Sequence, residues 1–397
     1  MRILQLCYKP PVPPVDGGTM AMNSITQGLL NAGHSVRVLS LSSEKHPLRN
    51  GDIDPLYLKR TELRCVQVDL SIHPVSAAVA LLCGESYNIK RFDTPEFHSL
   101  IRQTLESEVF DIIHVESIFL TPYLSTIRQY SKAPVVLRAH NVEHRIWQQI
   151  VKNTKRSLKR WYLKKLALAL RVYELEHIND YDGIVCITRD DADIFKQEGC
   201  RRPITDIPFG ININPLDDSQ GDPYTLFHIG AMDWKPNVEA IRWFIDEVWP
   251  RAKKEMPQLR LHLAGRKMPD DLMNLQLEGV TVEGEVPSAT RFMVDKQINI
   301  VPLRAGSGLR IKIVEAMSLG KTVIATSTAA SGIKYTDGED ILIANTPDRF
   351  VDQIRQCVNN SNLCHRIGRN AYQLACDNYS IENVTTKLTD FYNKLIH

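Results

Sequence analysis

Short apolar runs alternate with longer amphipathic segments along the whole chain, and this alternation constrains the fold more than any other feature. The first unit shows the pattern, with an apolar run at 3–7, a loop at 10–18, a helical pattern at 21–31 and a second apolar run at 36–41. Gly33 lies where a glycine commonly follows the end of a helix. Because strands that alternate with helices form parallel sheets covered by helices, an α/β fold is expected.

The alternation restarts near residue 224, which predicts two domains. The segment 207–212 contains Pro and Gly and is expected to be the hinge, since the chain turns polar at 217–222 just after it. A chain of 397 residues is long enough for two cores. Two α/β halves would enclose a cleft, because a doubly wound sheet binds ligands beyond the carboxyl ends of its strands. A helix with apolar spacing is expected at 238–254. Strands are expected at 3–7, 36–41, 65–69, 112–115, 135–138, 183–187, 226–230, 260–264, 280–282, 298–303 and 322–325.

Composition and charge exclude several classes of function. A formal net charge of +2 argues against nucleic acid as the main partner. The eight cysteines include no C-x-x-C pair, so free thiols in a reducing compartment are expected rather than a zinc ribbon or a redox motif. The first apolar run is too short for a signal peptide, and the longest run, 75–83, is about half the length of a membrane-spanning helix. A cytoplasmic protein is expected, peripheral at most to the inner face of the plasma membrane.

The segment 298–320 has the pattern of an anion-binding strand, loop and helix. An apolar run ends in a glycine-containing loop, and an apolar-periodic helix follows until Gly320. Free backbone N–H groups and the dipole at a helix start favour an anion. Arg310 and Lys312 place two cations there, and the carboxylate of Glu315 suits a pair of hydroxyls. A diphosphate with a ribose fits this set, and a solvated basic helix start is the alternative.

Two further motifs follow apolar runs in the first half. Asp16, Gly17 and Gly18 lie between the first strand and its helix, where paired glycines let a backbone approach a ligand, although a plain tight turn fits equally well. His140 follows the run 135–138, at a strand end where α/β active sites form. A histidine there can bond a sugar hydroxyl or shuttle a proton, or it can be a structural residue satisfied by the backbone.

A zinc site is the third pattern to weigh. His140, Glu143 and His144 match the H-x-x-E-H spacing of some zinc proteases. Because His140 ends a strand, the two histidines would not share a helical face, so the pattern does not favour zinc.

The segment 152–165 is strongly basic and contains Trp161 and Tyr162. A helix of this kind can lie on an anionic membrane surface, and the apolar run 75–83 can dip into lipid. The alternatives are a helix with a solvated face and a core helix.

Taken together, these residues resemble the retaining glycosyltransferases of the GT-B fold, and within them glycosyltransferase family 4. The most specific part is 304–332, which includes the run EAMSLGKTVIA from Glu315 onward. The runs 227–237 and 138–144 and the Gly17–Gly18 pair also fit, so the resemblance covers nearly the whole chain.

The resemblance implies a domain plan. Two Rossmann-like domains with parallel sheets would face an interdomain cleft. An N-terminal acceptor-binding domain would occupy 1–205 and a C-terminal domain that binds the nucleotide-sugar donor would occupy 206–375. A last helix within 376–397 would cross back to the N-terminal domain.

The resemblance also implies roles in the donor domain. Glu315 matches the second glutamate of the family's E-x7-E motif, which implies a hydrogen bond to the donor ribose. Gly308 matches the glycine after the first glutamate, in the loop that meets the diphosphate, and Leu309 follows it. Gly284 lies in the segment 282–286, which is similar to the one whose backbone borders the nucleobase.

In the acceptor domain the resemblance implies that His140 lies near the transferred sugar. Gly17 and Gly18 match the glycine loop that closes on the donor.

The sequence departs from the family pattern at two places. Ser307 stands where the first motif glutamate is expected, so its contact to the sugar is missing or altered. After the first donor-domain strand, Ala231 replaces an arginine, and the expected lysine position is Pro236, one beyond Lys235. Lys235 and Ser307 remain donor-binding candidates.

The positive charge that these departures remove would come from Arg310 and Lys312, which join His140 as the catalytic candidates. The expected activity is metal-independent, retaining transfer of a sugar from a nucleoside diphosphate donor, most readily UDP- or GDP-linked. The acceptor would be a glycan, a lipid-linked molecule or a small molecule, and the reaction would belong to cell-surface polysaccharide or glycolipid synthesis. The enzyme is expected to need no cofactor. A GT-B sugar-nucleotide epimerase, a non-catalytic nucleotide-binding scaffold and, less favoured, a zinc hydrolase are the alternatives.

Overall fold

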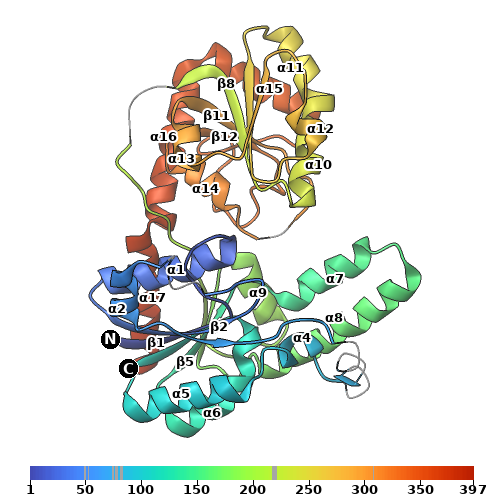
Figure 1. Cartoon of the computed structure of the whole chain (residues 1–397). Coiled ribbons are helices and arrows are strands. Elements are labelled where there is room, and N and C mark those ends of the chain that lie inside the picture. Colours follow the sequence, from blue (N-terminus) through green and yellow to red (C-terminus); the bar gives the residue numbers. More distant parts are fainter. Residues whose placement is uncertain are drawn as a thin grey trace. The chain divides into compact units, whose positions relative to one another are not determined.

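The computed structural model describes residues 1–48, 51, 53–73, 76, 79–80, 84–216, 221–306 and 308–397. The chain forms two compact units, which are treated separately below (Figure 1). Unit 1 comprises Met1–Gly210 and Val384–His397, and unit 2 comprises Ile211–Asn383. The units therefore divide after Gly210 and Asn383, whereas the sequence predicts boundaries at 205/206 and 375/376.

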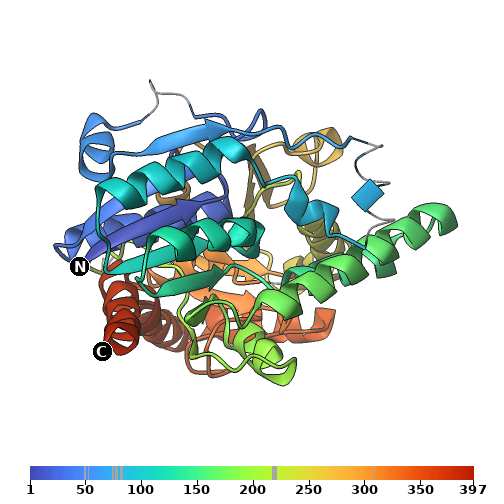
Figure 2. The same ribbon diagram turned by 90° about the horizontal axis from the view of Figure 1, so that it is seen from below.

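Unit 1 is built on a seven-stranded sheet in which every pair of neighbouring strands is parallel. Its strand order, β3-β2-β1-β4-β5-β6-β7, reverses between β1 and β4. Both chain termini lie at the same edge of this unit (Figures 1 and 2). The strands are β1 Arg2–Cys7, β2 Ser35–Ser42, β3 Arg64–Gln67, β4 Ile112–Glu116, β5 Val135–Ala139, β6 Gly183–Cys186 and β7 Ile204–Asp206.

Helices cover both faces of this sheet, and the alternation of side chains along β1 shows how. Ile3 and Cys7 pack with residues of α1 and α17, whereas Leu4 and Leu6 belong to the larger cluster that includes α5, α6, α8 and α9. Strands buried on both faces are apolar almost throughout, which is why their sequence signal is strong. The helices are α1 Gly17–Asn31, α2 Pro55–Thr61, α4 Tyr87–Lys90, α5 Pro95–Ser107, the 3₁₀ helix η2 Ile118–Tyr123, α6 Leu124–Tyr130, α7 Glu143–Asn153, α8 Ser157–His177, α9 Arg189–Gln197 and α17 Ile381–Ile396.

Unit 2 repeats this plan with six parallel strands in the order β10-β9-β8-β11-β12-β13. In each unit the first strand lies beside the fourth, which is the topology of a doubly wound dinucleotide-binding fold. The strands are β8 Asp222–Ile229, β9 Arg260–Ala264, β10 Val280–Gly284, β11 Lys296–Val301, β12 Thr322–Ala325 and β13 Leu342–Ile343. The helices are α10 Lys235–Trp243, η3 Phe244–Val248, α11 Trp249–Glu255, α12 Asp270–Met273, α13 Ala289–Val294, α14 Ile311–Met317, α15 Pro347–Asn359 and α16 Ser361–Tyr379.

The predicted fold class, two α/β units with parallel sheets, is confirmed. The segment 238–254 is helical, as predicted, but it is not a single regular α-helix. The segment 238–254 is interrupted by the π-helical turn η3, and α11 begins one residue before Pro250. Proline has no N–H to donate to the carbonyl four residues earlier, so a regular α-helix cannot continue through it. The sequence also misses β7 and β13, which have only three and two residues.

Among the described residues, no helix is long and apolar enough to cross a membrane.

Candidate active site

The switch point of unit 1 places several polar side chains beyond the ends of neighbouring strands. Tyr8 follows β1, Glu116 is the last residue of β4, and His140 follows β5 directly. Ligands of doubly wound sheets bind at this edge, where the strand order reverses. The position of His140 therefore agrees with its predicted location at a strand end.

Glu116 holds the ring of His140. The carboxylate is buried, and its Oε2 lies 2.7 Å from Nε2 of His140, while Oε1 lies 3.0 Å from Nε2 of His114 and accepts a hydrogen bond from Nε2 of Gln5 at 2.9 Å. Burial alone would raise the pKa of Glu116, but the charge of His114 and the hydrogen bonds from both histidines hold it below its ordinary range. Glu116 is therefore ionised, and each histidine donates its Nε2–H to it.

The hydrogen-bonded chain continues away from His140. Nδ1 of His114 lies 2.5 Å from Oη of Tyr392, which α17 contributes. A charged His114 donates from both ring nitrogens, so its Nδ1–H donates to the phenol oxygen, whereas a neutral ring that donates from Nε2 accepts at Nδ1 from the phenol. By the same rule a neutral His140 presents Nδ1 as an acceptor. Four side chains, Gln5, His114, Glu116 and Tyr392, come from two strands and one helix, and together they set the orientation of a single imidazole.

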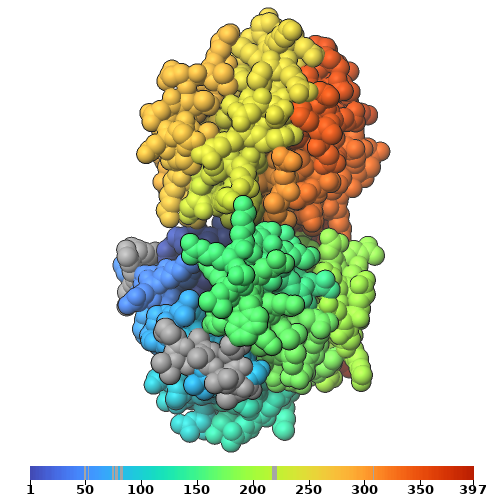
Figure 3. Space-filling model, turned by 90° about the vertical axis from the view of Figure 1, so that its right-hand side faces the viewer, coloured from blue at the N-terminus to red at the C-terminus, as the bar shows by residue number. Residues whose placement is uncertain are grey.

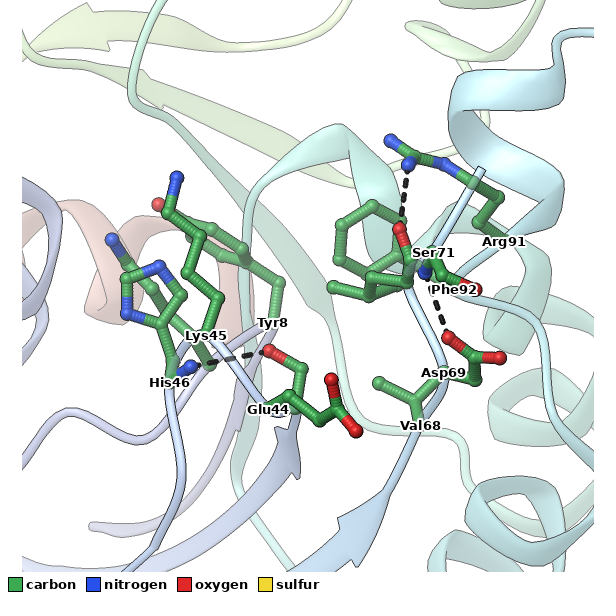
Figure 4. Close-up of a pocket in the computed structure, with 12 residues that line it drawn as sticks. Tyr8, Glu44, Lys45, His46, Val68, Asp69, Ser71, Arg91 and Phe92 are labelled. Atoms are coloured by element: carbon green, nitrogen blue, oxygen red, sulfur yellow. Dashed lines mark hydrogen bonds between the residues drawn. The ribbon is translucent and has the colours of Figure 1, made fainter. Parts of the chain in front are cut away.

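Tyr8 connects His140 to a cavity of about 440 Å³ in the same unit (Figure 4). Its ring packs edge-on against that of His140, with centroids 5.9 Å apart. Lys45 and His46 lie on one side of the cavity and Asp69 and Arg91 on the other (Figure 4). The lining comes from the segments after β1, β2 and β3 and from the end of α4: Tyr8, Lys9, Ser43, Glu44, Lys45, His46, Val68, Asp69, Leu70, Ser71, Arg91 and Phe92.

The sequence predicts that the Gly17–Gly18 pair lies in a loop. In the structure these glycines are instead the first two residues of α1. The side chain of Asp16 caps the helix by accepting from the N–H of Thr19 at 2.9 Å and also pairs with Lys9 at 2.7 Å. A Cβ atom at Gly18 would lie 2.8 Å from Oη of Tyr8, so a larger residue there would require the side chains of Tyr8 and Lys9 to shift.

The residues of the zinc-protease pattern do not converge. Nε2 of His140 contacts Glu116, whereas His144 is buried with Nδ1 2.7 Å from Glu174 and Nε2 3.1 Å from Glu198. Within the described part of the chain, no group of His, Cys, Asp and Glu side chains has the arrangement of a metal site.

Unit 2 places the predicted anion-binding segment at its own switch point, between the ends of β8 and β11. Gly306 and Gly308 have φ values of 122° and 85°, which favour glycine. The guanidinium of Arg310 lies over the ring of Trp234, 5.0 Å from its centroid. A Cβ atom at Gly306 would lie 2.5 Å from a guanidinium nitrogen of Arg310, so a side chain there would displace this stack. Ser307 lies outside the described residues.

Lys312 and Glu315 are one turn apart on α14, and Nζ of Lys312 donates to Oε2 of Glu315 at 2.6 Å. Arg310 is the N-cap residue of this helix and its side chain makes no capping hydrogen bond. Gly308 and Leu309 precede it, so the structure gathers the predicted diphosphate and ribose groups on one short segment. Their roles stay predictions.

The two other donor-binding candidates have local partners. Lys235 is the first residue of α10, is exposed, and pairs with Glu239 on the same helix at 3.1 Å. Gly284 ends β10 with φ 65°, and its carbonyl accepts from the N–H of Gly265 at 2.7 Å.

Sequence reasoning missed the residues that hold His140, namely Gln5, His114, Glu116 and Tyr392. A signal was present for Glu116, because it is a polar residue at the end of an apolar strand, the same criterion that selects His140. The resemblance implies that the last helix crosses back to the N-terminal domain, but nothing in the sequence indicates that its Tyr392 reaches His114 of β4.

Comparison with known proteins agrees with this arrangement. The model of Glycosyltransferase Family 4 matches residues 15–214, and the model of Glycosyl transferases group 1 matches residues 223–360. The sequence is 22% identical over 303 residues to an uncharacterized 44.6 kDa protein in the cps region of Klebsiella pneumoniae. The aligned region covers 73% of this chain and 76% of that protein.

The fold is similar to several solved structures. Sucrose-phosphate synthase from Thermosynechococcus elongatus matches with a TM-score of 0.69 at 15% identity, over 100% of this chain and 99% of that one. Anabaena HepE in complex with UDP matches with a TM-score of 0.66 at 15% identity, over 99% and 100% of the two chains. With a family model that spans half of its length and two doubly wound units of the GT-B type, the chain belongs to glycosyltransferase family 4.

Proposed function

We propose that this protein is a retaining glycosyltransferase that moves a sugar from a nucleoside diphosphate donor to a glycan, lipid-linked or small-molecule acceptor in cell-surface polysaccharide or glycolipid synthesis. The family supports the reaction class. Structures of HepE with UDP and with UDP-glucose support a nucleotide-sugar donor. The relative in the cps region supports the role in polysaccharide synthesis.

The observation that carries the proposal is the anchored His140. Its ring is fixed by a buried, ionised Glu116 and lies against Tyr8, which also lines the cavity of unit 1. A fixed imidazole that contacts the cavity lining through Tyr8 is suited to orienting a sugar beside an acceptor, because the ring loses little freedom when the substrates bind.

In the proposed reaction the bond between the anomeric carbon and the donor phosphate breaks, and the acceptor oxygen forms its bond on the same face. The acceptor proton passes to the leaving phosphate oxygen. Arg310, Lys312 and the backbone N–H groups of Gly308 and Leu309 would stabilise the charge of the leaving diphosphate, so side-chain cations could do the work of a metal. No carboxylate nucleophile is required by this step.

Glu315 would bind the donor ribose. A carboxylate has about four acceptor sites, so its bond to Lys312 leaves room for two hydroxyl donors.

Turnover of donor sugars tests the assignment. UDP-, GDP- and ADP-sugars are first screened by thermal shift, because a ligand that binds the native state raises its melting temperature. With the donor that binds, Arg310→Ala and Lys312→Ala should each lower turnover by about two to three orders of magnitude, while the exposed Lys254→Ala should not. Near-normal turnover of both variants would refute the proposed roles.

The same assay separates the alternatives. An epimerase would convert the donor without an acceptor. A non-catalytic scaffold would bind nucleotide without any turnover, and this alternative is tested because Ser307 stands where the first motif glutamate is expected. A zinc hydrolase would contain stoichiometric metal by elemental analysis.

We further propose that the enzyme acts in the cytoplasm, at the inner face of the plasma membrane. The sequence offers the segments 152–165 and 75–83 for this contact, and most of 75–83 lies outside the described residues.

A further inference from the structure

The helix α8 carries an apolar line on its outer side. Leu158, Trp161, Leu168 and Val172 are 80%, 54%, 54% and 45% exposed. They are spaced three, seven and four residues apart, so on a helix they lie along one stripe. We call these four residues the α8 stripe.

The α8 stripe is not part of the core. The buried residues of α8 are Leu166, Ala167, Leu170 and Glu174, which lie on the opposite side of the helix. Leu170 belongs to the main core of unit 1, and Leu166 packs with Tyr87. A helix that already has a buried face does not need a second apolar line for folding, and an exposed line of large side chains indicates a binding surface.

Cations surround the stripe, and no acid balances them. The chain has no Asp or Glu from Lys152 to Tyr173. Lys165 falls within the stripe and Lys164 beside it on the helical wheel. The structure breaks the basic segment predicted at 152–165 into the end of α7 and the start of α8, with a connection at 154–156. The seven cations of this segment form no ion pair with a described residue: Lys152, Lys155, Arg156, Lys159, Arg160, Lys164 and Lys165.

This charge decides between two partners for the stripe. A second copy of the chain, packed stripe to stripe, would bring like charges together. An anionic bilayer instead attracts Lys and Arg at its headgroups and accepts Trp and Leu at the boundary with the acyl chains. In Figure 3 the green surface of α7 and α8 faces the viewer and forms an outer side of unit 1.

We propose that the outer face of α8 binds an anionic lipid bilayer, with the α8 stripe at the acyl boundary and the surrounding cations at the headgroups. This contact rests on the proposed location at the inner face of the plasma membrane and names the surface that makes it, and it does not depend on the identity of the donor. It would hold unit 1 and its cavity at the surface where a lipid-linked acceptor is found.

Vesicle co-sedimentation of the full chain tests the proposal. The protein should sediment with vesicles of phosphatidylcholine and phosphatidylglycerol but not with phosphatidylcholine alone, and added salt should weaken binding because it screens the headgroup charge. Trp161→Glu and the double variant Lys164→Glu/Lys165→Glu should each weaken binding by about ten-fold or more. The matched controls are Val109→Glu, at an exposed valine on another part of unit 1, and Lys254→Glu in unit 2; both should bind normally.

Binding is measured apart from turnover, so the two proposals can fail separately. Every variant changes an exposed side chain, and an unchanged thermal unfolding curve verifies the fold. Equal binding to both kinds of vesicle, or wild-type binding by Trp161→Glu, would overturn the lipid contact. Light scattering that shows a dimer which Trp161→Glu converts to a monomer would assign the stripe to a second copy instead.

Discussion

At the scale of single residues, the candidate site depends on the atoms that hold His140. Glu116 is an acceptor for two histidine rings and one amide, all within 3.0 Å. An ionised carboxylate can accept all three because it has no proton of its own to place. Its position relative to His140 resembles that of the carboxylate that orients the histidine of a serine-protease triad, which fixes a tautomer rather than moving a proton.

Glu116→Gln should lower kcat by about ten- to a hundred-fold and change KM little. The amide N–H₂ group cannot accept a hydrogen bond from a ring N–H, so the His140 ring must either turn or adopt its other tautomer. Initial rates across pH give the readout, since a positioning role predicts a shifted profile as well as a lower maximum. Glu106→Gln, on the exposed side of α5, is the matched control. An unchanged pH profile with lower stability would reduce Glu116 to a structural role.

Glu143, the first residue of α7, makes the stability of unit 1 depend on pH. Burial, followed by the charge of Glu174, raises its pKa to about 8. In the folded chain it is protonated at neutral pH, whereas in the unfolded chain it ionises above about pH 4.3. The native state therefore binds the proton more tightly, and this contribution to stability is lost as pH rises from about 4 towards 8.

Glu143→Gln should accordingly lose less stability than the wild type between pH 5 and pH 8, by an amount on the order of one to a few kcal/mol. Urea unfolding at the two pH values measures the difference. Asp191 also has a pKa raised by burial, so the comparison with the wild type is the informative quantity. Parallel pH dependences for wild type and variant would show that Glu143 is ionised in the fold.

At the scale of elements, α7 begins without a capping side chain of its own. Its N-cap residue is Val142, and the free N–H groups of Glu143 and His144 donate instead to the carboxylate of Glu174 on α8, each at 3.1 Å. The same carboxylate accepts from Nδ1 of His144 at 2.7 Å. One side chain from the neighbouring helix thus accepts hydrogen bonds from the free N–H groups at the start of α7, and these bonds connect α7 to α8.

Glu174→Ala should lower the free energy of unfolding by about 3 kcal/mol, because it leaves one buried N–H group, one part-buried N–H group and a buried histidine without their acceptor. Glu176→Ala, two residues further along α8 and exposed, should have almost no effect. Denaturant unfolding of both variants gives the comparison. Equal losses would mean that water or another side chain satisfies α7.

At the scale of the whole molecule, α17 makes the fold discontinuous in sequence. Val384, Leu388 and Tyr392 are buried in the core of unit 1 together with residues of α1 and β2. The core of this unit is therefore incomplete until the last residues of the chain are present. The same helix provides the phenol that bonds His114, so the end of the chain contributes to both the stability of unit 1 and the geometry of its candidate site.

Leu388→Ala should destabilise unit 1 by about 2–5 kcal/mol, since it leaves a cavity in a closed core. Lys394→Ala, exposed on the same helix, serves as the control. Native-state hydrogen exchange followed by mass spectrometry resolves the units, and peptides of β1 and α1 should lose protection while those of β8 and β9 keep it. Equal loss in both sets would mean that the two units unfold together.

The predictions from sequence succeeded where the signal is local. Strand β12 and the start of β4 fall where the apolar runs predict them, and His140 follows β5 as expected. The predictions failed where distant residues decide the outcome. The Gly17–Gly18 pair, predicted in a loop, begins α1 instead, and the helical segment at 238–254 contains the π-helical turn η3, which the apolar spacing did not predict.

The sequence by itself determined the α/β class, the two-part organisation and the family, because strand and helix periods and short motifs are properties of neighbouring residues. Only the tertiary structure decided what holds His140, what lines the cavity of unit 1 and which side of α8 is left uncovered. Gln5, Glu116, His140 and Tyr392 are far apart along the chain, and the contacts among them exist only once parallel strands and the final helix have packed. A residue type specifies the bonds it can form, but the fold selects its partner.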